Sequence, residues 1–334
     1  MLDVYSKLDH EPGNIVLSEY SIQRALRMLF EGARGATRAQ MAEVLGEPDA
    51  ELPSPTKFKH TEANGVWIQE GLELDPKYRS TVQERYNAGV EEVDFLRAAE
   101  PARLAINRWV ADATDNQISD LLQPDMVSNA TRLLLANAIT FKGAWAVPFE
   151  ETMTFLRDFH LVDGSSVKVA TMFQSLRVRV AQDAGMTLFE LPYDGGCSMR
   201  ILVPQQWERL DLAQLPKLES ELTEAEILVH LPRFDTGYRL DAARLLASMG
   251  MPDLFCERAD LSGVTPDAAL FVSKVIHEAR IQTDEKGTTA SAATATQLTL
   301  GSIPPTVDVD RPFLFWVRCG DVTLFRGRIL DPRV

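Results

Sequence analysis

The amino-acid sequence predicts an α+β fold, because helical patterns dominate the first third of the chain and strand patterns dominate the rest. The chain has 334 residues, of which 45% are hydrophobic and 25% are charged, which are ordinary values for a globular protein. No internal repeat divides it, and no linker is long enough to separate two domains. We therefore expect one domain over residues 1–334 that buries a full core.

Helices are expected first along the chain. Apolar residues recur at helical spacing over residues 22–31, and Ser21 is the expected N-cap of that helix. The next elements are expected in this order: a helix that starts over residues 37–42, a proline-containing loop over 47–60, a strand over 65–68, and helices over 76–86 and 98–112.

Strand patterns follow from residue 132 onward. Residues 133–141 are mostly apolar, which indicates a strand that is buried on both faces. Further strands are expected over residues 167–172, 188–191, 199–203, 227–231, 271–283, 313–318 and 322–329, with a helix over 240–249 among them.

The charge of the chain argues against nucleic acids and anionic membranes as partners. It carries 34 Lys and Arg residues against 48 Asp and Glu residues, a formal net charge of −14, and no basic cluster offsets this locally. No stretch approaches the ~18 apolar residues of a membrane span. The first residues lack a signal-peptide pattern, so we expect a cytoplasmic protein, or an extracellular one if a leader was removed.

Motifs of known enzyme and metal sites are missing from the sequence. Cys197, Cys256 and Cys319 are far apart and have no zinc-binding spacing, so we expect reduced, mostly buried cysteines. The five histidines have no metal-binding spacing either, and His277 by itself is typical of a half-buried, hydrogen-bonded histidine. No GxSxG, HExxH, P-loop or GxGxxG motif occurs. Residues 165–168 match the SxxK motif, but they directly follow Asp163-Gly164, which is more typical of a polar hairpin turn than of a catalytic nucleophile. We expect no metal, no cofactor and no enzymatic activity.

One segment has an unusual composition. Residues 287–301 (GTTASAATATQLTLG) carry no charge and no proline, and most of them are small. A flexible linker is one interpretation, although linkers are more often rich in Gly and Ser or in Pro. The alternative is a strand-forming segment, because Thr294 and Thr296 stand on alternate positions. A long loop that can become a strand is a candidate conformational switch.

Motifs along nearly the whole chain, from about residue 14 to residue 332, resemble those of the serpin family. They are residues 14–22 (NIVLSEYSI), 32–37 (GARGAT), 137–145 (NAITFKGAW), 259–263 (ADLSG), 272–279 (VSKVIHEA), 284–288 (DEKGT), 310–313 (DRPF) and 325–332 (FRGRILDP). The resemblance implies the serpin fold, in which helices surround a large mixed central sheet with smaller sheets beside it. It also implies that residues 285–305 contain the hinge and the exposed reactive-centre loop.

The resemblance implies a suicide inhibitor that traps a protease as a covalent complex. In the family, the protease cleaves the loop, and the loop then inserts as a new central strand. Insertion requires small, uncharged side chains in the hinge. Thr288, Ala290, Ala292 and Thr294 of the implied hinge meet this requirement, and Glu285 and Gly287 form the base of the hinge. Thr289 stands where the family often has Glu, which should not block insertion.

Further positions are implied to control the opening of the sheet. Glu285 is expected to pair with Arg233, and Trp145 matches the tryptophan at the top of the sheet. Ser18, Ser21, Asn137 and His277 match a polar cluster beneath the opening region; without the resemblance, these positions would be ordinary core. Glu19 departs from the proline that is usual there.

The loop sequence limits the classes of protease that could cleave it. The family pattern sets the scissile bond at Gly301–Ser302, with Leu300–Gly301 as the alternative. Neither bond follows a basic residue or an Asp, so elastase-, chymotrypsin- or subtilisin-like serine proteases are favoured. The alternatives are a papain-like cysteine protease, which would read Leu300, and a non-inhibitory carrier or chaperone. Heparin is an improbable partner, because residues 48–60 are too short for the family's usual helix and the chain is acidic. We expect a monomer.

Overall fold

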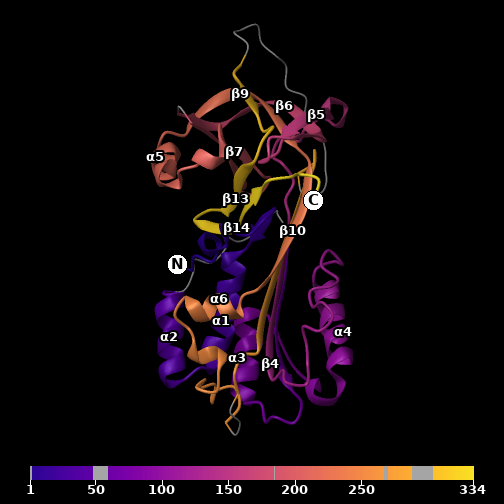
Figure 1. Ribbon diagram of the computed structural model, residues 1–334, viewed down its shortest axis with the longest axis vertical. Helices are drawn as coiled ribbons and strands as arrows, with labels where there is room; N and C mark the ends of the chain where they lie inside the picture. Colours follow the sequence, from indigo (N-terminus) through magenta and orange to yellow (C-terminus); the bar gives the residue numbers. More distant parts are fainter. Residues whose placement is uncertain (1, 48–58, 184, 267–269, 288–303) are drawn as a thin grey trace.

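The computed structural model describes residues 2–47, 59–183, 185–266, 270–287 and 304–334. The described residues form helices and two β-sheets, which confirms the predicted α+β class (Figure 1). Among them, the smaller sheet has five strands in the order β10 (Phe234–Asp241), β11 (Lys274–Thr283), β4 (Leu133–Lys142), β2 (Lys59–Gln69) and β3 (Gly89–Val93). This sheet is mixed, because β11 runs parallel to β4 and β2 parallel to β3, while the other neighbours are antiparallel.

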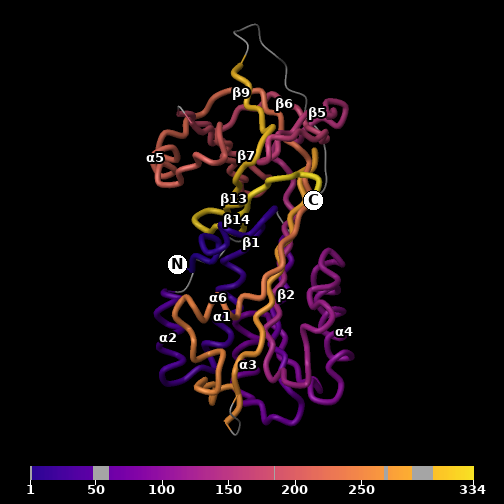
Figure 2. The backbone as a smooth tube through the Cα atoms, viewed as in Figure 1, coloured from indigo at the N-terminus to yellow at the C-terminus, as the bar shows by residue number. Residues whose placement is uncertain are grey.

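The larger sheet has nine strands within the described residues. Its main path runs β1 (Ile15–Leu17), β14 (Val322–Ile329), β13 (Phe313–Cys319), β8 (Cys197–Pro204), β7 (Met186–Pro192), β6 (Ser166–Gln182), β9 (Thr223–Pro232) and β12 (Thr306–Asp308), and β5 (Phe155–His160) pairs with β6. The pairing of β1 with β14 brings the first and last strands of the chain together (Figure 2).

Helices cover both faces of the five-stranded sheet. In Figure 1, α4 lies on one face, and α1, α2, α3 and α6 lie on the other. The α-helices are α1 (Glu19–Gly32), α2 (Gly35–Leu45), α3 (Pro76–Tyr86), α4 (Phe95–Ala113), α5 (Leu215–Ser220) and α6 (Ala243–Ser248). Short 3-10 helices are η1 (Tyr5–Leu8), η2 (Glu151–Met153), η3 (Trp207–Arg209), η4 (Leu212–Gln214) and η5 (Asp253–Phe255). Strand β4 is buried along nearly its whole length, as its apolar sequence predicts.

The first long helix begins earlier than predicted. Its N-cap is Ser18, whose side chain accepts a hydrogen bond from the backbone N–H of Ser21 at 3.1 Å, so Ser21 lies inside the helix. Glu19 is the first helical residue, and its carboxylate accepts a hydrogen bond from Tyr5 N at 2.9 Å. Burial raises the pKa of this carboxyl. The departure at Glu19 therefore ties the N-terminal η1 to α1.

Other boundaries also differ from the sequence predictions. The helix predicted over residues 240–249 starts only at Ala243, because Leu240 and Asp241 end strand β10. Lys59 and His60, predicted as loop, open strand β2. Strands β1, β3, β5, β10 and β12 were not predicted. β1 and β12 have only three residues each, and exposed positions interrupt the apolar pattern of β3, β5 and β10. Helix α3 has the predicted bounds, with Asp75 as its N-cap.

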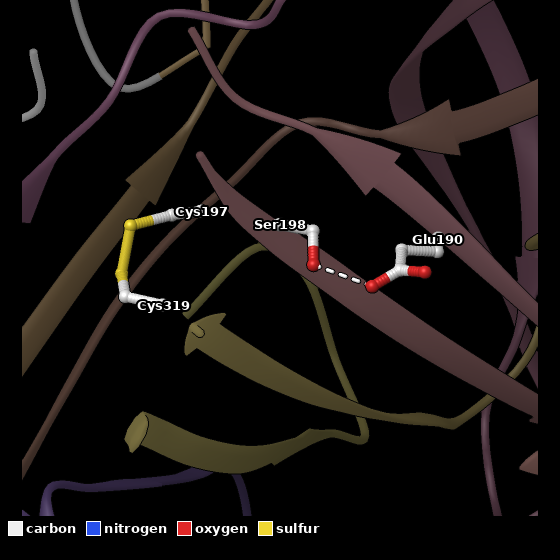
Figure 3. Close-up of a disulfide and its surroundings, with 4 residues drawn as sticks. All are labelled: Glu190, Cys197, Ser198 and Cys319. Atoms are coloured by element: carbon white, nitrogen blue, oxygen red, sulfur yellow. Dashed lines mark hydrogen bonds between the residues drawn. A yellow bond between two sulfur atoms is a disulfide. The ribbon is translucent and has the colours of Figure 1, made fainter. Parts of the chain in front are cut away.

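The prediction of reduced cysteines is wrong for two of the three. Cys197 on β8 and Cys319 on β13 form a disulfide (Figure 3). They are directly opposite each other in an antiparallel pair, with their Cα atoms 4.2 Å apart, which is the close type of cross-strand position. A separation of 122 residues in the sequence concealed this pairing. Cys256 is free.

Candidate functional site

The site is built around two parallel strands at the centre of the five-stranded sheet. Strands β4 and β11 are directly hydrogen-bonded, in a register that sets Asn137 opposite His277 and Phe141 opposite Ile281. Above the pair, the chain leaves β11 and turns over residues 284–287. Gly287 pairs with Asp284 on one side and with Ala144, just beyond β4, on the other. The base of the hinge therefore lies at the fork between the two strands.

Glycine is required at this fork. Gly287 has a φ of +106°, a value that residues other than glycine rarely adopt. A Cβ atom there would also lie 2.5 Å from Trp145 N and 2.8 Å from Ala144 Cα. The backbone geometry and the close approach thus both exclude a side chain.

Glu285 anchors the base of the hinge through its carboxylate. It is 3% exposed and accepts hydrogen bonds from Arg233 Nε at 2.8 Å and from the Thr154 hydroxyl. Burial by itself would raise the pKa of the carboxyl, but the hydrogen bonds from Arg233 and Thr154 outweigh it and hold the pKa below its ordinary value. The structure brings Arg233 and Glu285 together, although 52 residues separate them in the sequence.

A buried polar cluster lies lower on the same strand pair. Ser18 N donates to Nε2 of His277 at 3.3 Å, so this nitrogen is unprotonated. The proton is therefore on Nδ1, which lies against Oδ1 of Asn137. Asn137 Nδ2 in turn donates to Ser21 Oγ at 2.7 Å. Burial lowers the pKa of His277 to about 3, which keeps the ring neutral.

Asn64 completes the cluster and was missed by sequence reasoning. Its Oδ1 accepts a hydrogen bond from Asn137 Nδ2 at 2.5 Å, and its own amide donates to Glu62 at 3.3 Å. Asn64 faces Asn137 in the pairing of β2 with β4. The indication in the sequence was that an asparagine directly precedes the apolar run 65–68. The strand was expected to begin only at residue 65, after this asparagine.

Trp145 lies at the top of the site, next to the hinge. Its indole Nε1 donates to Asp284 O at 2.9 Å, and its backbone N–H donates to Lys286 O at 3.1 Å. Phe149 N donates to Glu285 O at 2.8 Å. Three hydrogen bonds thus hold the backbone of residues 284–286 against the segment that follows β4.

A cleft of about 480 Å³ opens beside the hinge. It is lined by charged side chains that include Glu151, Arg233, Glu285, Lys286 and Arg333. Within the described ranges, no three His, Cys, Asp or Glu side chains are grouped so that they could hold a metal ion. No helix in the described part of the chain is long and apolar enough to cross a membrane.

Several predicted site residues lie outside the described residues. They are the hinge residues Thr288, Ala290, Ala292 and Thr294 and the candidate scissile positions Leu300, Gly301 and Ser302. Residues 48–58, on which the heparin prediction rests, also lie outside the described residues.

Comparisons with known proteins match the chain over nearly its whole length. The family model described as serpin (serine protease inhibitor) matches residues 1–332. The leukocyte elastase inhibitor of Bos taurus is 35% identical, and the alignment covers 97% of this chain and 95% of the relative. The protein Iris of Ixodes ricinus is 34% identical, with 99% and 96% covered.

Solved structures of the same family have the same fold. Uncleaved ovalbumin superposes with a TM-score of 0.88 at 27% identity, covering 98% of this chain and 96% of that one. Native protease nexin-1, solved with heparin, gives a TM-score of 0.89 at 29% identity and the same coverage. The full-length family match, the relatives at 34–35% identity and the shared fold agree, and the chain belongs to the serpin family.

Proposed function

We propose that this chain is a suicide inhibitor of a serine protease of the elastase, chymotrypsin or subtilisin type, and not an enzyme. The protease serine would attack the carbonyl of Gly301, release the amine of Ser302 and leave the loop as an acyl-enzyme. Insertion of the freed loop would then carry the protease away and stop deacylation. The observation that supports this most is the fork at Gly287, from which a strand can enter between β4 and β11.

The two ladders at the fork agree on one register for the inserted strand. Continued antiparallel to β11, the pairing of Asp284 with Gly287 would bring Ala290 opposite Ile281. Continued antiparallel to β4, the pairing of Ala144 with Gly287 would bring Ala290 opposite Phe141. Ile281 and Phe141 already face each other, so one strand satisfies both edges without a shift.

This register divides the hinge side chains between two environments. Thr288, Ala290, Ala292, Thr294 and Thr296 would share a face with the buried Phe141, Ile139, Ala279 and Ile281. Thr294 would come between Asn137 and His277, where a small polar side chain suits the polar cluster. Thr289 would instead fall opposite Gln282, which is exposed. The register therefore requires small residues on the core face, whereas position 289 would also accept a larger side chain.

Insertion is favourable because it replaces one ladder by two. The parallel pair would become two antiparallel pairs over about ten residues. Each added hydrogen bond would contribute a net stabilisation of ~1 kcal/mol. The freed loop would gain on the order of 10 kcal/mol, before side-chain burial and the entropy of ordering are counted.

The target class rests on the loop sequence and on relatives. Leu300 and Gly301 supply aliphatic and small residues at the cut, and the printed name of a relative, leukocyte elastase inhibitor, agrees with an elastase-like target. A papain-like cysteine protease, which would read Leu300, is the second candidate. The disulfide favours an oxidising compartment outside the cytoplasm over the cytoplasmic alternative, because cytosolic thiols are kept reduced.

A panel of proteases tests the proposal. The chain is incubated with elastase, chymotrypsin, subtilisin, trypsin and papain, and each mixture is run on a denaturing gel. We expect an SDS-stable adduct with at least one of the first three. An adduct with papain alone would favour the second candidate, and cleavage without any adduct would leave a non-inhibitory serpin.

Two matched variants test the register itself. Thr288→Arg would bury a charge on the core face, so we expect cleaved chain in place of adduct. Thr289→Arg adds the same side chain one position later, on the exposed face, and should form adduct as the unmodified chain does. Equal behaviour of the two variants would contradict the register.

A further inference from the structure

The segment that carries Trp145 is held on both of its edges. On the hinge side, Trp145 N donates to Lys286 O at 3.1 Å, and Ala144 pairs with Gly287. On the other side, Ala146 N donates to Pro192 O at 2.9 Å, and Asp194 N donates to Ala144 O at 2.7 Å. Residues 144–146 therefore lie between two isolated β-bridges, Ala144 with Gly287 and Trp145 with Tyr193. They link the fork to the hairpin that joins β7 and β8.

Tyr193 is the side chain that makes this link firm. Its ring stacks on the indole of Trp145, with centroids 4.3 Å apart and planes 7° from parallel. It also meets Phe141 of β4 edge to face at 4.9 Å. Tyr193 is only 2% exposed, so it acts as a buried platform under Trp145.

The hairpin that carries Tyr193 turns at two consecutive glycines, which restrict the backbone less than other residues would. Gly195 and Gly196 both have positive φ values, +108° and +87°, in a sequence where glycine leaves many conformations open. Two bonds anchor the hairpin immediately beyond this turn. Tyr193 N donates to Cys197 O at 2.8 Å, and the Cys197 side chain is joined covalently to Cys319 on β13. In addition, Ser198 Oγ donates to Glu190 at 2.6 Å, which ties β8 to β7 (Figure 3).

We propose that the Cys197–Cys319 disulfide and Tyr193 act as a brace that positions Trp145 and the β4 side of the fork for loop insertion. Every link in the brace is a direct contact: disulfide, hairpin, Tyr193, Trp145, hinge. Tyr193 is a positioning residue, because it acts on the loop through the two rings that it contacts, Trp145 and Phe141. The inference rests on the proposed function, since it names what sets the efficiency of insertion.

The brace matters because insertion competes with deacylation of the protease. In the register derived above, the first new pairing would join Thr288 to Gly143, next to the existing pairing of Gly287 with Ala144, so the backbone there must already be extended and in place when the loop is cut. Without the brace, this backbone would sample other conformations and the first pairings would form more slowly. More acyl-enzyme would then be hydrolysed before trapping, and the inhibitor would behave more as a substrate.

Variants can separate the covalent bond from simple packing. Cys197→Val with Cys319→Val keeps a buried apolar cross-strand pair and removes only the bond. Tyr193→Leu removes the stacking, whereas Tyr193→Phe keeps it. Cys256→Val is the matched control, because it removes a cysteine that is not in the disulfide.

Hydrogen exchange on the uncleaved chain tests the brace independently of any protease. In the double Val variant and in Tyr193→Leu, we expect amides of residues 143–149 to exchange about fivefold faster or more, while amides of α6 are unchanged. Tyr193→Phe and Cys256→Val should match the unmodified chain. Unchanged exchange at residues 143–149 in both disruptive variants would overturn the brace, even if the proposed inhibition were never observed.

The second readout is the number of inhibitor molecules consumed for each protease trapped. We expect this ratio to rise about twofold or more in the double Val variant and in Tyr193→Leu, with Tyr193→Phe restoring it. A ratio that stays at the unmodified value would overturn the proposal. If the uncleaved double Val variant or Tyr193→Leu lost inhibition spontaneously, that would also overturn the proposal. The brace would then serve to hold the sheet closed and not to position Trp145 for insertion. If the unmodified chain traps no protease at all, the proposed function fails, and the exchange result alone decides on the brace.

Discussion

His277 should remain uncharged far below the pH at which an exposed histidine binds its proton. It is fully buried, and burial lowers its pKa from 6.5 to about 3. Between these two values, the unfolded chain binds a proton that the folded chain does not bind. The free energy of unfolding therefore falls as pH falls, by up to about 1.4 kcal/mol per pH unit and by about 5 kcal/mol in total near pH 3. For a chain of this length, this corresponds to about 2 °C in the thermal midpoint per pH unit.

The assay is an NMR titration of the histidine ring protons between pH 4 and pH 8. The His277 signal should not move over this range. His277→Gln identifies the signal, and its thermal midpoint should depend less steeply on pH than that of the unmodified chain. Asn64 connects the cluster to charged side chains, because its amide donates to Glu62, which in turn forms an ion pair with Arg24. A His277 signal that titrates near pH 6.5 would refute the buried, neutral assignment.

Two further substitutions probe the base of the hinge. Glu285→Ala removes the carboxylate that accepts from Arg233 and Thr154, and we expect a loss of about 1–2 kcal/mol, measured as a thermal midpoint about 2 °C lower. Arg177→Ala is the control, because its ion pair is largely exposed and its midpoint should not change; equal losses in both would argue against an anchoring role for Glu285. Gly287→Ala should cost more than Gly164→Ala in a thermal melt, because both have positive φ but a Cβ at Gly164 meets nothing within 4 Å. Equal costs would mean that the close approach at the fork is unimportant.

The sequence predicted the class of fold and several elements well where one local signal dominates. Helix α3 has the predicted bounds because Asp75, Pro76 and the following pattern all mark the same start. Strand β4 was evident because it is apolar along its length. Element boundaries were predicted less well where two elements meet without a turn signal. Leu240 and Asp241, for example, continue strand β10 by pairing with β11, and this long-range pairing leaves no local trace.

The site shows the same division between local and long-range information. Family motifs indicated Arg233, Glu285 and the residues around His277, although nothing local in the sequence connects them. The contribution of Asn64 depends on the register between β2 and β4, and the disulfide depends on the register between β8 and β13. The role of Tyr193 likewise depends on the long-range packing of its ring against Trp145. Registers of this kind are set by the packing of the whole sheet, so one sequence does not specify them.

Cleavage of the loop followed by a thermal melt tests loop insertion most directly. If residues 288–297 enter between β4 and β11 in the register derived above, the added ladder is worth on the order of 10 kcal/mol. The thermal midpoint of the cleaved chain should then exceed that of the intact chain by more than about 10 °C. An unchanged or lower midpoint after complete cleavage within residues 299–303 would contradict insertion.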